Sequence, residues 1–208
     1  MEQNRDIYIL GAGGHGKVIA ELAIACGYTL QGFIDIDTSK QPFGKPTITL
    51  ESYLKIAKHA TIALAIGNNH VREKLYKELK SLHLSIATLI HPSSIVSTTA
   101  LIKEGTVILA NALIHTDTII QIGTIINSGA IIEHDNTIGA FSHISPGACL
   151  AGEVSIGEKT HIGIGSTVIQ QITIGANSII GAGSVVIKDL PDKITAVGNP
   201  AKVIKTHE

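Results

Sequence analysis

A strict six-residue spacing of aliphatic residues constrains the fold of this chain more than any other feature. From Ile90 to Val186 every sixth residue is Ile, Leu or Val, at seventeen consecutive positions. At 44% hydrophobic content, such a run in one frame would arise by chance on the order of once in a million sequences, so it is a structural repeat. The positions are Ile90, Val96, Ile102, Ile108, Ile114, Ile120, Ile126, Ile132, Ile138, Ile144, Leu150, Ile156, Ile162, Val168, Ile174, Ile180 and Val186.

A period of six fits neither a helix nor a plain alternating strand, but it fits a parallel β-helix whose coil has three short sides. Each side contributes one inward aliphatic, and a coil of about eighteen residues stacks roughly 4.8 Å above the last. No inserted loop interrupts the register, so the working surface is expected on the flat sides and corners of the prism.

The position two residues before each aliphatic is mostly small, as expected for the narrow interior of such a prism. Its small occupants are Ser94, Ala100, Thr106, Ala112, Thr118, Thr124, Ala130, Ser142, Ala148, Thr160, Ser166, Ser178 and Ser184. Asn136, Val154 and Ile172 occupy the same position, so small size is a preference. The composition agrees, since aromatic residues make up 3% of the chain and tryptophan is absent.

Before Leu89 the six-residue spacing fails and strands alternate with helices. The pattern predicts strands over 6–10, 30–34, 61–66 and 85–89, and helices over 14–26, 50–58 and 69–82. This alternation indicates a small parallel Rossmann-like sheet. We therefore expect an α/β domain over 1–88 and an all-β prism with a C-terminal tail over 89–208.

A glycine motif marks a candidate ligand site in the first domain. The segment from Gly11 to Gly16 reads GAGGHG and matches G-x-G-x-x-G between a predicted strand and helix, where backbone amides can cradle a phosphate. Asp35 ends the second strand, where it would meet a ribose or a base. The turn containing Gly67 and Asn68 lies on the same sheet edge, which favours a nucleotide-type ligand. NAD would also fit the motif, and so would a tight turn that binds nothing.

His134 is the candidate for chemistry in the repeat, because it stands between Glu133 and Asp135 in a region otherwise rich in Ile, Gly, Ser and Ala. A histidine that is neutral near pH 7 accepts protons, and a carboxylate fixes its tautomer. The alternative is a surface histidine on an exposed face. Neighbouring strand residues point to opposite sides. Asp135 would therefore touch His134 only at a corner, or would orient a histidine across an interface.

Spacing relates three further residues to His134. His143 lies nine residues on, half a coil away, so it falls on another side of the prism. A shared site would need a second prism, which suggests a trimer with sites in the grooves between subunits. Gly152 lies one coil above His134 and leaves room for a ligand. His161 should stack above His143, but no third ligand stands nearby, so no metal is expected.

Charge and cysteine usage exclude some classes of function. The net charge is −1 and no basic run occurs, so nucleic acid is not an expected partner. No stretch is long and apolar enough for a signal peptide or a membrane span, and no membrane insertion is expected. Cys26 and Cys149 lack metal-ligand spacing and are interpreted as reduced packing residues. A cytoplasmic protein is the resulting prediction.

Four segments carry a family resemblance over nearly the whole chain: ILGAGGHGKVIAE, AIGNNHVREKL, IIEHDNTIGAFSHISPGACLAG and VGNPAKVIK. They resemble the hexapeptide-repeat acyltransferases. The resemblance is to bacterial enzymes that N-acetylate UDP-4-amino-sugars in the bacillosamine pathway, and to their sialic acid O-acetyltransferase relatives. The resemblance implies a left-handed β-helix in a homotrimer, preceded by a nucleotide-sugar domain.

The resemblance also implies roles for individual residues. The general base falls on His134 and its carboxylate partner on Asp135, where the bacillosamine enzymes typically carry Glu. Contacts to acetyl-CoA or the groove fall on Asn127, His143, Gly152, Ile164 and Gly181, and Lys202 is a further candidate for the CoA phosphates. The nucleotide sugar falls on Gly13, His15, Asp35 and Asn68, to which the glycine motif and the second turn add Gly11, Gly14 and Gly67.

The implied reaction is direct acyl transfer, with acetyl-CoA as co-substrate and no metal. A 4-amino group that loses its proton to His134 attacks the thioester, and a group in the groove stabilises the oxyanion. Two alternatives stay open at this point. One is O-acetylation of a sialic-acid-like or other nucleotide sugar, and the other is a non-catalytic or NAD-binding scaffold built on the same folds.

Overall fold

The computed structural model describes residues 5–57 and 59–207. The chain forms two compact units that divide between Pro92 and Ser93, whereas the sequence pattern predicts a boundary between residues 88 and 89. No helix in the described part of the chain is long and apolar enough to cross a membrane.

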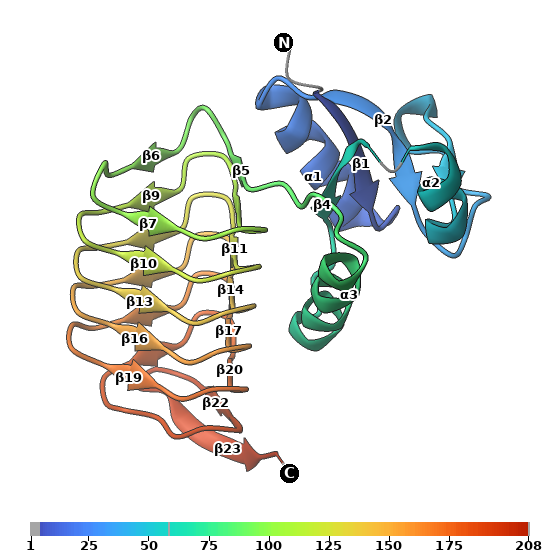
Figure 1. Cartoon of the computed structure of the whole chain (residues 1–208). Helices are drawn as coiled ribbons and strands as arrows, with labels where there is room; N and C mark the ends of the chain where they lie inside the picture. Colours follow the sequence, from blue (N-terminus) through green and yellow to red (C-terminus); the bar gives the residue numbers. More distant parts are fainter. Residues whose placement is uncertain (1–4, 58, 208) are drawn as a thin grey trace. The chain divides into compact units, whose positions relative to one another are not determined.

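The first unit is a small parallel sheet with helices (Figure 1). The strands follow the order β3-β2-β1-β4 and every pair is parallel. They are β1 (Asp6–Leu10), β2 (Thr29–Ile34), β3 (Thr47–Ile48) and β4 (Thr61–Leu64), with α1 (Gly14–Ala25), the 3₁₀ turn η1 (Pro42–Gly44), α2 (Leu50–Ile56) and α3 (Asn69–Ser81). Ile7, Ile9 and Ile62 are fully buried, as expected for strands covered on both faces.

Besides one-residue shifts at the ends of the elements predicted over 14–26, 30–34 and 69–82, larger differences separate the prediction from the structure. The strand predicted over 85–89 is wrong: Ile86 forms only an isolated bridge to Ile62, through hydrogen bonds of Ser85 and Ala87, and the short β5 (Leu89–Ile90) follows. The third strand ends at Leu64, because the chain turns there towards α3. With two residues, β3 is too short for a periodicity to predict. The predicted end of α2 at Lys58 lies outside the described residues.

The second unit is a three-sided parallel β-helix (Figure 1). The β13 face consists of β7 (Leu101–Ile102), β10 (Ile119–Ile120), β13 (Thr137–Ile138), β16 (Ser155–Ile156) and β19 (Thr173–Ile174). The β12 face consists of β6 (Ile95–Val96), β9 (Leu113–Ile114), β12 (Ile131–Ile132), β15 (Cys149–Leu150), β18 (Thr167–Val168) and β21 (Val185–Val186). The β14 face contains β8 (Val107–Ile108), β11 (Ile125–Ile126), β14 (His143–Ile144), β17 (His161–Ile162), β20 (Ile179–Ile180), β22 (Ile194–Val197) and the antiparallel β23 (Lys202–Thr206).

The interior of the prism is the aliphatic row that the spacing predicts. From Ile108 to Val186 every member of the row is almost fully buried. Val96 and Ile102 near the start of the prism are only partly buried, and Ile90, in the first unit, is 39% exposed. The buried hydroxyls of the small row are satisfied by backbone, as where Thr160 Oγ1 donates to the Gly175 carbonyl at 2.7 Å. A polar residue in this interior therefore needs a backbone partner.

The alternation along β16 yields a test of this core. Ile156 is 3% exposed, whereas its neighbour Ser155 is exposed. We expect Ile156→Asp to destabilise the prism by about 3–5 kcal/mol, because the carboxylate would be buried without a partner. Ser155→Asp, the matched control on the outer side of the same strand, should melt close to the wild type by circular dichroism. Equal melting temperatures for the two variants would contradict the inward orientation of Ile156.

Candidate functional site

His134 and Asp135 meet at a corner of the prism, where the chain turns from β12 to β13. Asp135 adopts a left-handed backbone conformation with φ of 58°, which Asp tolerates better than most residues. This turn brings adjacent side chains together, with His134 Nδ1 2.8 Å from Asp135 Oδ2. Of the two arrangements left open by the sequence, contact within one chain is the one observed.

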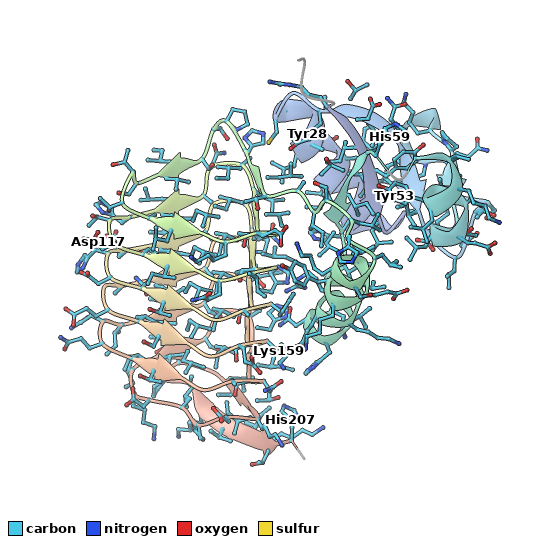
Figure 2. All side chains as sticks on the ribbon, in the orientation of Figure 1. Tyr28, Tyr53, His59, Asp117, Lys159 and His207 are labelled. Atoms are coloured by element: carbon cyan, nitrogen blue, oxygen red, sulfur yellow. The ribbon has the colours of Figure 1, made fainter. Side chains whose placement is uncertain are left out.

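The carboxylate sets the chemistry of the imidazole. Because a carboxylate can only accept, Nδ1 of His134 carries the hydrogen and Nε2 of the neutral ring keeps its lone pair. The hydrogen bond that His134 donates to Asp135 raises the pKa of His134, partial desolvation lowers it, and the charges of Asp135, Glu133 and Glu153 raise it further. His134 therefore has the tautomer and basicity of a general base. Asp117, which lies one coil earlier at the same corner, projects away from the prism (Figure 2).

Gly152 lies one coil after His134 and closely approaches its ring. A Cβ at this position would stand 2.4 Å from Cε1 and 2.6 Å from Nε2 of His134. No side chain fits at that distance, so glycine is required by the approach of the imidazole. The edge of the ring that carries Nε2 is thus held over bare backbone.

The β14 face carries a second polar group. Asn127 Oδ1 accepts from the Ser128 amide at 2.9 Å, so its Nδ2 faces His143 Nε2 at 3.1 Å. Nε2 of a neutral His143 is then the acceptor and Nδ1 carries the hydrogen. The ring of His143 stacks against that of His161, with centroids 4.7 Å apart and planes tilted by 30°. This stacking is what the eighteen-residue spacing predicts.

The other residues of the prism that are predicted to contact acetyl-CoA or the groove come later in the chain than His134. Ile164 is 60% exposed, and Lys202 is exposed at the start of β23. A Cβ on Gly181 would stand 2.6 Å from Val197 Cγ1, so that glycine is explained by packing. Within residues 5–57 and 59–207, no group of three or more His, Cys, Asp or Glu side chains could hold a metal ion.

The topology keeps His134 and His143 apart in one prism. The corner of His134 joins the β12 and β13 faces, whereas His143 begins β14 on the third face. In a triangle, a corner lies opposite the remaining side. A site that uses both histidines therefore needs two prisms.

In the first unit, each glycine of the G-x-G-x-x-G motif occupies its position for a different structural reason. Gly11 has φ of 113°, and a Cβ there would stand 2.8 Å from the Ala65 carbonyl oxygen. Gly16 lies against the Gly11 carbonyl, with no room for a Cβ. Gly13 caps α1 without a side-chain hydrogen bond, and Cβ atoms on Gly13 or Gly14 would meet nothing within 4 Å. The start of α1 is therefore open, as an anion site requires.

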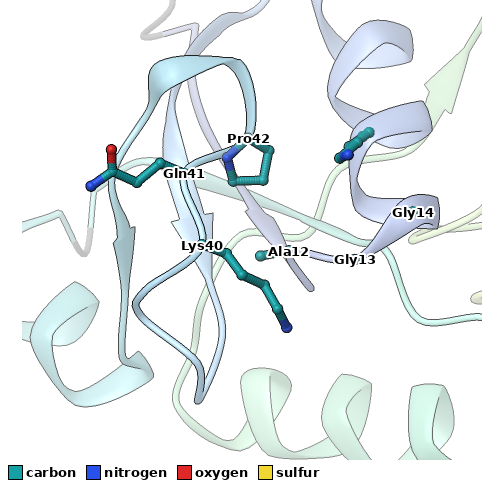
Figure 3. Close-up of a pocket in the computed structure, with 7 residues that line it drawn as sticks. Ala12, Gly13, Gly14, Lys40, Gln41 and Pro42 are labelled. Carbon is teal, nitrogen blue, oxygen red and sulfur yellow. The ribbon is translucent and has the colours of Figure 1, made fainter.

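A pocket with a volume of about 420 Å³ lies at this helix start (Figure 3). It is lined by Ala12, Gly13, Gly14, Lys17, Lys40, Gln41 and Pro42. The sequence motif does not predict the last four of these residues. Lys17 has a usable signal, since it lies on the first turn of the helix that follows the motif. Lys40, Gln41 and Pro42 come from the loop after β2, and no pattern predicts where that loop folds.

Asp35 holds the backbone around this pocket. Its Oδ2 accepts from the Ala12 amide at 2.9 Å, its Oδ1 accepts from the Asp37 amide at 3.1 Å, and Lys40 Nζ lies 3.7 Å from Oδ2. Burial alone would raise the pKa of Asp35, but these hydrogen bonds and the Lys40 charge lower it. The carboxylate thus ties the glycine turn to the β2 loop.

The second turn is fixed by a buried arginine. Arg72 is 1% exposed and its Nη1 donates to the Ile66 and Gly67 carbonyls at 2.8 and 3.2 Å. Asn68 Oδ1 caps α3 by accepting from the Val71 amide.

Burial, assisted by the Arg72 charge, lowers the pKa of His15 to about 4. His15 is therefore neutral near pH 7, with its buried Nε2 unpartnered within the described residues.

The His134–Asp135 pair predicts a measurable titration. We expect the imidazole of His134 to titrate above the ordinary pKa of a histidine, and Asp135→Asn to lower that pKa, because the amide removes the negative charge at Nδ1. NMR titration of ring-labelled histidines measures both values, with His134 assigned from the signal lost in His134→Ala. An unchanged or raised pKa in Asp135→Asn would contradict the pairing.

Comparisons with known proteins agree with this architecture. Residues 6–79 match the family described as the PglD N-terminal domain, and residues 153–188 match the bacterial transferase hexapeptide family (six repeats). A curated relative, UDP-N-acetylbacillosamine N-acetyltransferase of Bacillus subtilis (strain 168), is 44% identical over 112 residues. That match covers 51% of this chain and 52% of the relative, so the chain spans about half the length of the curated relative it matches.

Two solved structures are similar over almost their whole length. A perosamine N-acetyltransferase mutant from Caulobacter crescentus, in complex with CoA and GDP-perosamine, is 38% identical with a TM-score of 0.93. That match covers 96% of this chain and 97% of the other. The acetyltransferase domain of PglB from Neisseria gonorrhoeae, in complex with acetyl coenzyme A, is 40% identical with a TM-score of 0.93, covering 97% of this chain and 100% of that chain.

These similarities confirm the expected fold class, a small Rossmann-like parallel sheet followed by a left-handed parallel β-helix. They also confirm the family resemblance that the four sequence segments carry. The chain belongs to the hexapeptide-repeat sugar N-acetyltransferases that carry a PglD-type N-terminal domain.

Proposed function

We propose that this protein transfers the acetyl group of acetyl-CoA to the amino group of a nucleotide-activated sugar, with His134 as general base. The single observation that carries this proposal is the His134–Asp135 pair, whose Nε2 carries the lone pair over Gly152. Relatives with 38–44% identity are named as sugar N-acetyltransferases, which favours N-acetylation over O-acetylation and over a non-catalytic or NAD-binding scaffold.

The chemistry is one direct transfer. The amine nitrogen forms a bond to the thioester carbonyl carbon as His134 Nε2 takes a proton from that nitrogen. The tetrahedral intermediate then expels the CoA sulfur as its C–S bond breaks, and the imidazolium returns the proton to the thiolate. Asp135 stabilises the imidazolium while it exists. Cys149 Sγ donates to the Gly147 carbonyl at 3.8 Å and not to a base, and no acyl-enzyme is proposed.

The first unit supplies a site for the nucleotide diphosphate. The open start of α1 offers backbone amides and a partial positive charge. Lys17 and Lys40 line the same pocket and add two cations. Gly13, Gly14 and His15 are proposed to contact this group, and Gly11, Asp35, Gly67 and Asn68 are proposed as further contacts of the sugar nucleotide. A UDP-4-amino sugar is the first choice, because the 44% identical relative is named for a UDP sugar.

The β14 face supplies contacts for acetyl-CoA. Asn127 Nδ2 lies 3.1 Å from Nε2 of His143, and both side chains are proposed to contact acetyl-CoA. Ile164 and Gly181 lie in the coils beyond His143 on the same side, where an extended chain could pass. Lys202 is proposed to meet a CoA phosphate, as an exposed cation at the end of the prism.

We further propose a homotrimer in which each site lies between two subunits. In one chain His134 occupies the corner opposite the face of His143. Only a neighbouring prism can place its β14 face beside that corner, and three-fold packing does so three times. A cytoplasmic location, where acetyl-CoA would be at hand, stays a prediction.

The function is tested with a panel of UDP-, GDP- and CMP-linked amino and hydroxy sugars together with acetyl-CoA. We expect CoA release with an amino sugar, and a fall in kcat of about 10²- to 10⁴-fold in His134→Ala, because the proton acceptor is lost. A coupled thiol assay measures the rate. Near-wild-type turnover by His134→Ala would refute the base assignment, and preferential reaction of hydroxy sugars would replace N- by O-acetylation.

Lys40→Gln serves as the matched control in this panel. It should raise the KM for the sugar nucleotide and leave that for acetyl-CoA unchanged, because Lys40 lines the pocket of the first unit. A change in the acetyl-CoA KM alone would contradict the assignment of that pocket.

Complementation tests the shared site. His134→Ala and His143→Ala chains, each nearly inactive alone, should regain activity when coexpressed, because roughly a quarter of the interfaces in random trimers carry both native histidines. Activity per mole of the purified mixture measures this recovery. Absence of recovery, or a sedimentation mass of one chain for the active protein, would contradict the shared site.

A further inference from the structure

We propose that Asn136 is a positioning residue whose side-chain amide holds the backbone on both sides of His134 and so fixes where the imidazole stands. This inference rests on the proposed function, in which His134 removes a proton from the acceptor amine. It assigns a role to the one amide in the small-residue row inside the prism.

The contacts of Asn136 surround the corner. Its side chain is fully buried. The two hydrogens of Nδ2 serve the carbonyls of Glu133 at 2.6 Å, Ala151 at 3.0 Å and His134 at 3.2 Å, one of them shared between two carbonyls, and Oδ1 accepts from the Val154 amide at 3.2 Å. The Glu133 carbonyl belongs to the peptide before the His134 α-carbon, and the His134 carbonyl to the peptide after it. One side chain therefore restrains both peptide planes whose rotation would swing the imidazole.

Other members of the row make only part of this pattern. Thr160 donates to the Gly175 carbonyl, fifteen residues on, and accepts from the Ser178 amide, eighteen residues on. Asn136 makes the equivalent bonds to Ala151 and Val154. Thr124 and Ser178 each also bond one carbonyl of their own corner, Gln121 and Ala176 respectively, whereas Asn136 bonds two, Glu133 and His134. A hydroxyl has one hydrogen and an amide has two, so a hydroxyl must share its hydrogen between the corner and the next coil, whereas the amide can hold each with a separate hydrogen.

The corner has little tolerance for movement. His134 must remain 2.8 Å from Asp135 and pass over Gly152 so closely that a single methyl group would collide with it. Thr118 supports the same corner from the preceding coil, by donating to the Glu133 carbonyl at 2.9 Å. A displacement of the base by about 1 Å can lower a rate on the order of 100-fold. Asn136 is therefore placed where it can affect the rate without touching substrate.

A purely structural role makes a different prediction. If Asn136 only joined neighbouring coils, its loss would lower the melting temperature and leave the titration of His134 unchanged. The charges that face His134 from the packed coils are Glu133, Asp135 and Glu153, and none of them is altered by a substitution at Asn136. A change in the His134 titration would therefore report a change in position.

The test compares Asn136→Ser with Thr160→Val. Asn136→Ser leaves one hydroxyl hydrogen to be shared between the next coil and the corner, as in Thr124, and so removes the separate amide hydrogen that holds the corner. Thr160→Val removes an equally buried hydroxyl from another corner that carries neither His134 nor Asp135. Should the serine variant fail to fold, Asn136→Thr fills more of the space and matches Thr118, the occupant one coil earlier. Thermal melting, steady-state kinetics and NMR titration of His134 are measured for each.

We expect Asn136→Ser to lower kcat about 10- to 100-fold with little change in either KM, since the base is displaced and the substrate sites are not. The pKa of His134 should fall towards its ordinary value as the pairing with Asp135 loosens. The acidic limb of the pH–rate profile, which rises as His134 loses its proton, should therefore move to lower pH. Thr160→Val should change the melting temperature alone.

Two outcomes would overturn the inference. One is an Asn136 variant that keeps the wild-type kcat and His134 titration, and the other is a Thr160→Val variant that shifts both in the same way. The NMR titration needs no turnover. A wild-type protein that transfers no acetyl group would therefore refute the proposed function, while the position of His134 in the variants would still be measured.

Discussion

The structure of the second unit depends on one interaction, the parallel hydrogen-bond ladder that joins each residue to the residue eighteen positions on. The ladder pairs Ile125 with His143 and His143 with His161. Inward aliphatic side chains prevent the coils from slipping, because a shift of one residue would bury the outward side chains instead. The number of a residue in the chain therefore fixes the face and the coil on which its side chain lies. The stacking of His143 on His161 and the approach of Gly152 to His134 both follow from this register.

The pair of His134 and Asp135 lies at a corner of the prism, where the chain turns from one face to the next. Along a flat face neighbouring side chains point in opposite directions, so His134 and Asp135 could not meet there. At the corner, the left-handed conformation of Asp135 brings the two together. The exposed imidazole owes its raised pKa to this carboxylate and to nearby charges. His15 in the first unit shows the opposite case, since burial keeps its ring neutral. Two histidines of one chain thus differ through their surroundings alone.

In the first unit, charged side chains support the backbone that forms the pocket. Asp35 accepts the Ala12 amide, and Arg72 holds the carbonyls of Ile66 and Gly67. Burial is strong enough to lower the pKa of Arg72 to about 9, and its hydrogen bonds compensate for part of the desolvation. Such residues fix a turn so that its amides point one way before any ligand arrives. Asn136 does the same for the corner of the prism, with a neutral amide in place of a charge.

The sequence by itself determined the repeat, the inward row, the glycine turn and the stacking partners, because each follows from a period or from a local motif. It could not determine whether Asp135 touches His134, since that depends on a corner dihedral angle that no period encodes. Nor could it find the pocket contribution of the loop around Lys40, or the short β3, because these depend on how irregular chain folds back onto the sheet. The bonds of Asn136 are of the same kind. Its sequence position shows only an exception in a row of small residues, and the tertiary structure alone decides which carbonyls lie within reach of its amide.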